Sequence, residues 1–139
     1  MQAIYTASAT ATGDGRNGHV RSSDGVLDFD LAVPKELGGA GGNFPNPEEL
    51  FAAGYAACFH SALKSAARLQ KITLTDTAVT ADVGIGRNDQ GGFGLTASIE
   101  VEIPGVDEAV ARQLVDAAHQ LCPYSNATRG NIDVQITLA

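Results

Sequence analysis

The middle of the chain is predicted to be a long helix that is apolar on almost every side. Asn46 suits the N-cap, Pro47 suits the first helical position, and Glu49 stands where a capping box needs an acid. The predicted helix runs from here to about Gln70, and its segment 50–59 is apolar nearly all round. Because a helix without a polar face has to be buried, we expect the fold to be built around this helix.

Three other segments alternate between apolar and polar residues, which is typical of antiparallel strands with one wet face. These segments are 27–33, 95–103 and 132–138, and weaker strand candidates are 3–12, 19–22 and 78–86. A second helix is predicted from about Asp107 to Leu121, ending before Pro123. Antiparallel strands grouped with two helices predict an α+β fold.

Composition limits the classes of protein and partner. The 139 residues suit one domain, 1–139, since no repeat or linker interrupts them. A content of 44% hydrophobic and 18% charged residues argues against disorder. The net charge of −7 argues against nucleic acid or an anionic membrane as the main partner. Since neither a secretory signal nor a long apolar run is seen, we expect a cytoplasmic protein.

Two glycine-rich stretches resemble nucleotide-binding loops but lack the surrounding pattern. Residues 13–18 read Gly-Asp-Gly-Arg-Asn-Gly, yet no helix pattern follows them. Residues 38–42 lack the Lys-Ser/Thr pair of a phosphate-binding loop. We therefore expect residues 13–18 to form a tight loop that presents Arg16.

Four cysteine and histidine side chains are candidate ligands of a zinc site: Cys58, His60, His119 and Cys122. Cys58 and His60 are two positions apart, so on a helix they point about 200° apart and do not easily ligate one metal. No metal is therefore expected. From pattern alone, each cysteine is more simply interpreted as a small buried hydrophobe.

Two long segments resemble the cysteine motifs of the organic hydroperoxide resistance proteins, the Ohr branch of the OsmC/Ohr superfamily. They are residues 46–59, NPEELFAAGYAACF, and residues 122–131, CPYSNATRGN. Shorter matches near residues 5–25 and 83–95 extend the resemblance over nearly the whole chain. The run Cys-Pro-Tyr-Ser at 122–125 is the part that is specific to the Ohr branch.

This resemblance implies an intertwined homodimer, with antiparallel sheet wrapped on long central helices. It also implies a thiol peroxidase that reduces alkyl and fatty-acid hydroperoxides to alcohols in oxidative stress defence. Cys58 would be the peroxidatic cysteine and Cys122 the resolving one, joined by a disulfide during the cycle. Arg16, preferred over Arg21, matches the catalytic arginine, and Glu48 matches the catalytic glutamate. No bound cofactor is implied, because the reductant is an external dihydrolipoyl dithiol such as dihydrolipoamide or a lipoylated protein.

An arginine would explain how a cysteine in an apolar helix reacts. Burial raises the pKa of a thiol, whereas only the thiolate attacks a peroxide well. Arg16 would hold the thiolate, and Glu48 would orient Arg16 through a bidentate salt bridge. However, Glu48 and Cys58 are about 15 Å apart along a straight helix and roughly 80° out of phase. Either the helix is broken near Gly54, or a second chain supplies part of the site.

Two other functions are weighed against this peroxidase. One is a non-catalytic module that binds an apolar ligand and keeps both cysteines in its core, but it has no need of a charged pair beside a thiol. The other is the broader OsmC branch, with a different substrate or reductant, which the run 122–131 disfavours.

Overall fold

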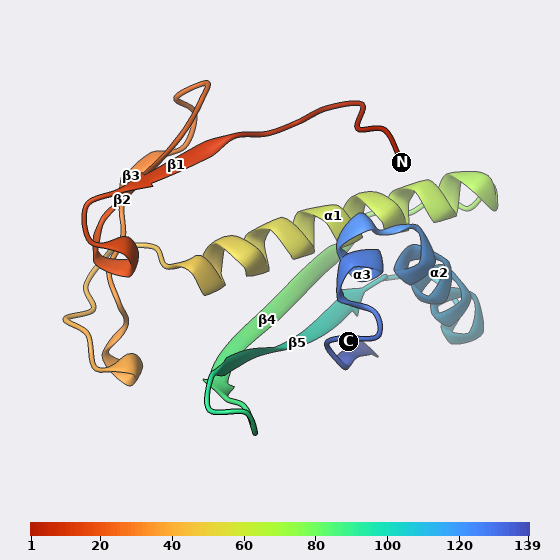
Figure 1. Cartoon of the computed structure of the whole chain (residues 1–139). Coiled ribbons are helices and arrows are strands. Elements are labelled where there is room, and N and C mark those ends of the chain that lie inside the picture. The colour runs from red at the N-terminus through yellow and green to blue at the C-terminus, as the bar shows by residue number, and fades with distance from the viewer. The chain divides into compact units, whose positions relative to one another are not determined.

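The computed structural model describes the whole chain, residues 1–139, and divides into two units, Met1–Leu50 and Phe51–Ala139. The first unit holds a three-stranded antiparallel ribbon (Figure 1). Its strands are β1 (Ala9–Thr12), β2 (His19–Ser22) and β3 (Asp28–Asp30), and its loops contain the 3-10 turns η1 (Gly15–Asn17) and η2 (Lys35–Leu37). The single domain expected from chain length stays a prediction.

The strands of this ribbon are shorter than the alternation of residue types predicts. β1 covers four residues of the predicted 3–12, and β3 covers three of the predicted 27–33. Beyond β3 the backbone bonds to the loop instead, since the Leu31 N–H donates to the Gly18 carbonyl (2.8 Å) and the Val33 N–H donates to the Asn17 side chain (3.0 Å). Asn46 is the one buried residue of this unit, so the ribbon has no hydrophobic core of its own.

The long helix α1 (Pro47–Leu69) begins with the predicted capping box. The Glu49 N–H donates to Asn46 Oδ1 (2.9 Å), and Asn46 Nδ2 donates to Glu49 Oε1 (3.2 Å). The helix continues without a break through Gly54, so the first of the two alternatives, a broken helix, is wrong. Although α1 has 23 residues, no helix of this chain combines the length and hydropathy needed to cross a membrane.

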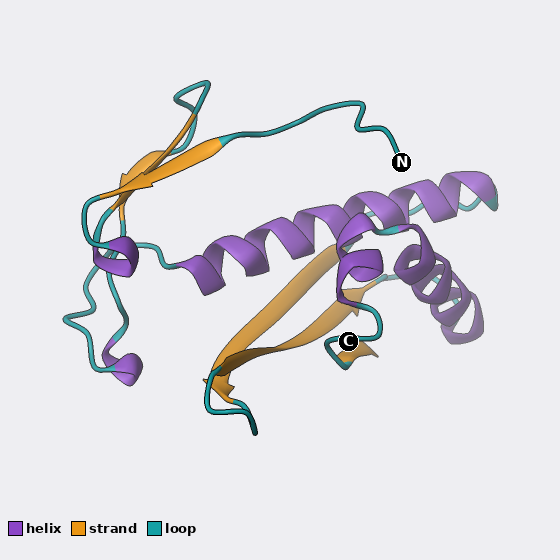
Figure 2. Cartoon of the chain, viewed as in Figure 1, coloured by secondary structure: helices purple, strands orange, loops and turns teal.

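The second unit adds a three-stranded sheet in the order β4-β5-β6 (Figure 2). Its strands are β4 (Ala78–Arg87), β5 (Phe93–Glu102) and β6 (Val134–Leu138). β4 and β5 form an antiparallel hairpin, but β6 runs parallel to β5, which the expectation of an antiparallel sheet missed. The reason is the connection between them, which passes through two helices and returns the chain in the same direction.

Those two helices are α2 (Glu108–Leu121), as predicted, and the short α3 (Pro123–Thr128), which was not predicted. Pro123 does end α2, but Cys122 then serves as the N-cap of α3 with Pro123 at its first position. The proline therefore marks a sharp corner between two helices rather than the start of a loop.

The hydrophobic core of the second unit lies between α1, β5 and α2. Its largest fully buried side chains are Tyr55, Phe59, Leu63, Ile99, Val101 and Leu114. Burial of α1 is one-sided, because Ala53 and Ala57 are exposed. The expectation of a helix buried all round is thus met on only one of its faces in the single chain.

Replacing Gly54 by alanine is expected to destabilise the protein, although alanine usually stabilises a helix relative to glycine. A Cβ atom on Gly54 would lie 2.7 Å from Tyr124 Oη and 3.1 Å from Tyr124 Cε2. Such overpacking costs about 1–3 kcal/mol, whereas alanine gains about 1 kcal/mol over glycine inside a helix. Gly54→Ala should therefore lower the free energy of unfolding by roughly 1 kcal/mol in urea denaturation.

Tyr124→Ala provides the matched background for this measurement, because it removes the ring that Gly54 accommodates. In that background, Gly54→Ala should raise the free energy of unfolding by up to about 1 kcal/mol. A stabilising effect of Gly54→Ala in the presence of Tyr124 would show that the ring does not occupy this space.

Candidate active site

Arg16 and Glu48 form a bidentate ion pair within the first unit. Arg16 lies on η1, and Glu48 lies in the first turn of α1. Arg16 Nη1 donates to Glu48 Oε2 (2.9 Å) and Nη2 donates to Oε1 (2.8 Å), which is the fork geometry that arginine and carboxylate prefer. The hydrogen bond from Arg16 lowers the pKa of Glu48, and the bond to Glu48 raises the pKa of Arg16. Both groups are therefore charged at neutral pH.

The neighbouring arginine is occupied elsewhere, which separates the two candidates for the catalytic arginine. Arg21 Nε lies 3.5 Å from Asp28 Oδ2 on the neighbouring strand of the ribbon. The loop 13–18 contains η1 and leads into β2 rather than into a helix, so it lacks the strand-to-helix arrangement of a dinucleotide site. Its tight turn presents Arg16 to Glu48.

Cys58 and Cys122 come together in the second unit, although they are far apart in sequence. Cys58 is half-buried in the middle of α1, Cys122 is fully buried at the corner between α2 and α3, and both thiols are free. Burial raises the pKa of Cys58, and a side-chain hydrogen bond with Cys122 raises this pKa further. The two cysteines are thus neighbours, and no disulfide joins them.

The start of α3 directs one backbone N–H toward each sulfur. The Ser125 N–H donates to Cys122 Sγ (3.5 Å), and a backbone hydrogen bond from Tyr124 lowers the pKa of Cys58 against the effect of burial. Backbone donors of this kind stabilise a thiolate. Sequence analysis missed Tyr124 and Ser125 as site residues. The signal was Pro123, because proline is favoured at the first position of a helix, where backbone N–H groups are unpaired.

Three aromatic rings pack together on the same part of α1. The ring centroids of Phe51, Tyr55 and Tyr124 lie between 5.8 and 6.3 Å apart in tilted or edge-on arrangements. Tyr55 lies one turn before Cys58 on the helix, and Tyr124 is held over Gly54. These rings give the surroundings of Cys58 an apolar character.

The candidate zinc ligands do not converge on a metal. His60 Nε2 bonds to Thr77 Oγ1 (2.8 Å), and His119 Nδ1 bonds to Ser125 Oγ (2.8 Å). No group of three or more His, Cys, Asp or Glu side chains is arranged to hold a metal ion. The chemistry that this arrangement supports is that of two adjacent thiols, together with a separate arginine–glutamate pair in the first unit.

Comparisons with known proteins agree on one family. The sequence model described as OsmC-like protein matches residues 39–137. The organic hydroperoxide resistance protein of Xanthomonas axonopodis pv. citri (strain 306) is 56% identical over 137 residues, covering 98% of this chain and 95% of the relative. The organic hydroperoxide resistance protein OhrB of Bacillus subtilis (strain 168) is 47% identical over 139 residues, covering 98% of each.

Solved structures give the same result. The crystal structure of an organic hydroperoxide resistance protein from Elizabethkingia anophelis superimposes with a TM-score of 0.95 at 55% identity, covering 100% of this chain and 99% of that one. The α+β architecture expected from the sequence is therefore the architecture of these proteins. The chain belongs to the OsmC family, in its organic hydroperoxide resistance branch.

Proposed function

We propose that this protein is a peroxidase that reduces organic hydroperoxides to alcohols and so defends the cell against oxidative stress. The thiol pair carries the proposal, because Cys58 and Cys122 are both free and Cys122 is close enough to contribute to the raised pKa of Cys58. Its relatives are organic hydroperoxide resistance proteins. A module that only binds an apolar ligand would have no use for two adjacent free thiols.

The first step is attack by the Cys58 thiolate on the hydroperoxide. A sulfur–oxygen bond forms and the O–O bond breaks, which oxidises Cys58 to a sulfenic acid and releases an alkoxide that takes up a proton. Burial raises the pKa of Cys58, so a positive charge is needed to keep the thiolate populated. We assign that task to Arg16, which stays charged and also stabilises the leaving alkoxide. Glu48 orients Arg16 through the two hydrogen bonds between them.

The second step closes a disulfide and the third reopens it. The Cys122 sulfur attacks the sulfenic sulfur of Cys58, a sulfur–sulfur bond forms, and the oxygen leaves as water. An external dithiol of the dihydrolipoyl type then reduces the disulfide by two exchange reactions and becomes a disulfide itself. This cycle requires a reducing compartment such as the cytosol, where dithiol reductants are maintained.

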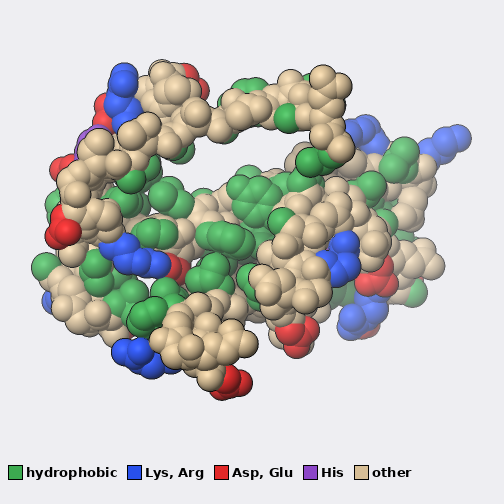
Figure 3. Space-filling view, viewed as in Figure 1, with side chains coloured by type: hydrophobic (Ala, Val, Ile, Leu, Met, Phe, Trp, Pro, Cys, Tyr) green, Lys and Arg blue, Asp and Glu red, His purple; other side chains and the backbone are tan.

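The active form is proposed to be a homodimer, in which the Arg16–Glu48 pair of one chain serves Cys58 of the other. Because α1 is unbroken, the remaining one of the two alternatives is that a second chain supplies part of the site. The first unit also lacks a core, and apolar side chains reach the molecular surface (Figure 3). Large exposed ones in that unit include Ile4, Tyr5, Val26 and Phe44. A second copy of the chain would cover such a surface.

The peroxidase cycle predicts how many thiols a peroxide consumes. One equivalent of cumene hydroperoxide should remove both free thiols of the wild-type protein, because Cys122 condenses with oxidised Cys58. In Cys122→Ser, the same treatment should leave a Cys58 sulfenic acid that a sulfenic-acid-specific reagent traps. Thiol titration and mass spectrometry measure these two species. Survival of both thiols in the wild type would instead make the cysteines inert core residues.

Arg16 is predicted to control the reactivity of Cys58. Arg16→Ala should raise the pKa of the Cys58 thiol, measured from thiolate absorbance, and slow peroxide reduction by about 100-fold. Arg21→Ala is the matched control, since Arg21 pairs with Asp28 in the same ribbon and should leave both values unchanged. Equal effects of the two substitutions would mean that the arginine acts through ribbon stability rather than through the thiolate.

A further inference from the structure

A chain of buried hydroxyl groups lies beside Cys122, and the reaction steps above make no use of it. The chain connects His119 Nδ1 to Ser125 Oγ (2.8 Å), Ser125 Oγ to Tyr55 Oη (2.8 Å), and Tyr55 Oη to Thr128 Oγ1 (3.3 Å). Ser125 and Tyr55 are fully buried and Thr128 nearly so. Every buried side-chain polar atom in this network has a hydrogen-bond partner.

Hydrogen counting allows this network to run in either direction. Thr128 Oγ1 lies within hydrogen-bond distance of both the Ser125 carbonyl (3.2 Å) and Tyr55 Oη (3.3 Å), so its one hydrogen can serve either acceptor. The Ser125 carbonyl also accepts from the Arg129 N–H (2.9 Å) and does not depend on Thr128. In both directions His119 Nδ1 bonds to Ser125 Oγ, as donor in one and as acceptor in the other.

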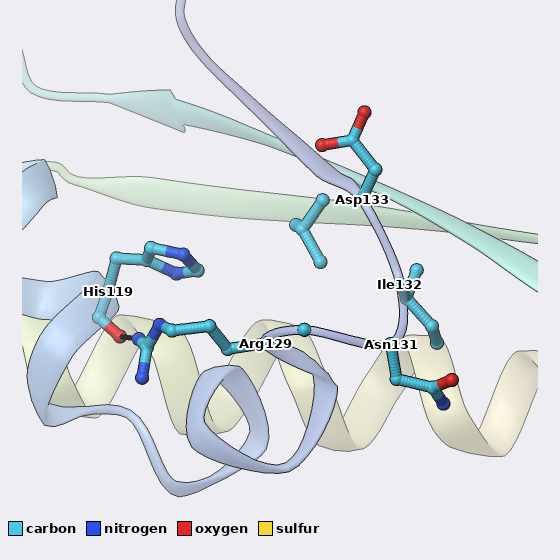
Figure 4. A pocket seen from close by; sticks show the side chains of 7 residues that line it. His119, Arg129, Asn131, Ile132 and Asp133 are labelled. Carbon is cyan, nitrogen blue, oxygen red and sulfur yellow. Dashed lines mark hydrogen bonds between the residues drawn. The ribbon is translucent and has the colours of Figure 1, made fainter.

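His119 is suited to this role by its surroundings. Burial lowers the pKa of its ring, and the charge of Arg129 lowers it further, so the ring is neutral at pH 7. Arg129 Nη2 also donates to the His119 carbonyl (2.6 Å), as Figure 4 shows. The ring borders an open pocket of about 420 Å³ that also includes Asp133 but neither cysteine.

This hydrogen-bond network fixes Ser125, whose backbone N–H faces the sulfur of Cys122, the proposed resolving cysteine. Ser125 bonds to His119 and to Tyr55 through its side chain, while its backbone N–H donates to Cys122 Sγ (3.5 Å). Both side-chain bonds anchor Ser125 to helices on either side, α2 through His119 and α1 through Tyr55. A donor held in this way stabilises negative charge on the sulfur without having to reorganise.

We propose that His119 is a positioning residue for the resolving step, in which it holds Ser125 so that the Ser125 N–H stabilises Cys122 as the attacking thiolate. This inference rests on the proposed peroxidase function, since it concerns the step in which Cys122 displaces water from the Cys58 sulfenic acid. His119 touches neither sulfur in this scheme. Its contribution passes entirely through Ser125.

The test separates the two oxidation steps in single-turnover experiments with one equivalent of cumene hydroperoxide. His119→Leu removes the bond to Ser125 Oγ and should slow disulfide formation by about tenfold, while Cys58 sulfenic acid still forms at the wild-type rate. His119→Asn places an amide, which can donate or accept, near the position of Nδ1 and should restore disulfide formation to within about twofold of wild type. His119→Gln is the matched control, because it carries the same amide near the position of Nε2 and should be as slow as His119→Leu.

Slow resolution in the Leu and Gln variants with recovery in Asn supports the positioning role. Equal slowing of sulfenic acid formation and disulfide formation would show a structural effect on the whole site, and no recovery in Asn would show that the bond made from the Nδ1 position is not what matters. Both results would overturn the inference. A wild-type protein that forms no sulfenic acid would instead overturn the proposed function, and a His119→Leu chain that fails to fold leaves the Asn and Gln pair to decide.

Discussion

The hydrogen bond between Tyr55 Oη and Ser125 Oγ, 2.8 Å long and fully buried, fastens the α2–α3 corner to the long helix. Two consequences depend on this attachment. Cys122 at the corner becomes a neighbour of Cys58 on α1, and the ring of Tyr124 packs over Gly54. A buried hydroxyl pair is stabilising only when both groups are fully satisfied, and here additional bonds complete the network. The reactive geometry is thus maintained by polar contacts inside an otherwise apolar core.

Burial of Cys58 disfavours its thiolate, and other groups of the proposed site counteract this effect. Desolvation raises the pKa of Cys58 and so disfavours the thiolate that peroxide chemistry needs. The backbone donor of Tyr124 in α3 acts against this effect, but a peptide dipole carries no net charge. A full positive charge is available in Arg16, which Glu48 holds in a fixed orientation. In the proposed site, the second unit supplies the two reactive sulfur atoms and the first unit supplies the positive charge of Arg16.

Features that depend on neighbouring residues were predictable from the sequence. The capping box of Asn46 and Glu49, the hairpin of β4 and β5 and the extent of α2 all follow from local patterns. Features set by distant contacts were missed. The parallel pairing of β6 depends on the path of the connection rather than on alternation, and α3 owes its place to Ser125 bonding with Tyr55.

The residues of the candidate site fall into the same two groups, those predictable from the sequence and those set by distant contacts. Arg16, Glu48, Cys58 and Cys122 came from motif resemblance, because their types and order in the chain are specific. His119 and Ser125 have roles that exist only through a buried network spanning two helices, which no spacing in the sequence reveals. One-sided burial of α1 was also hidden, because a purely apolar segment predicts contact on every side without saying which partner provides it.

Turnover of organic hydroperoxides through the two thiols is tested most directly by steady-state consumption of cumene hydroperoxide, compared with hydrogen peroxide, with dihydrolipoamide as the electron donor. We expect sustained turnover that is abolished in Cys58→Ser and is faster for cumene hydroperoxide, because the surroundings of Cys58 are apolar. Equal rates for the two peroxides would contradict the substrate class, and consumption no faster than with Cys58→Ser would contradict the peroxidase itself.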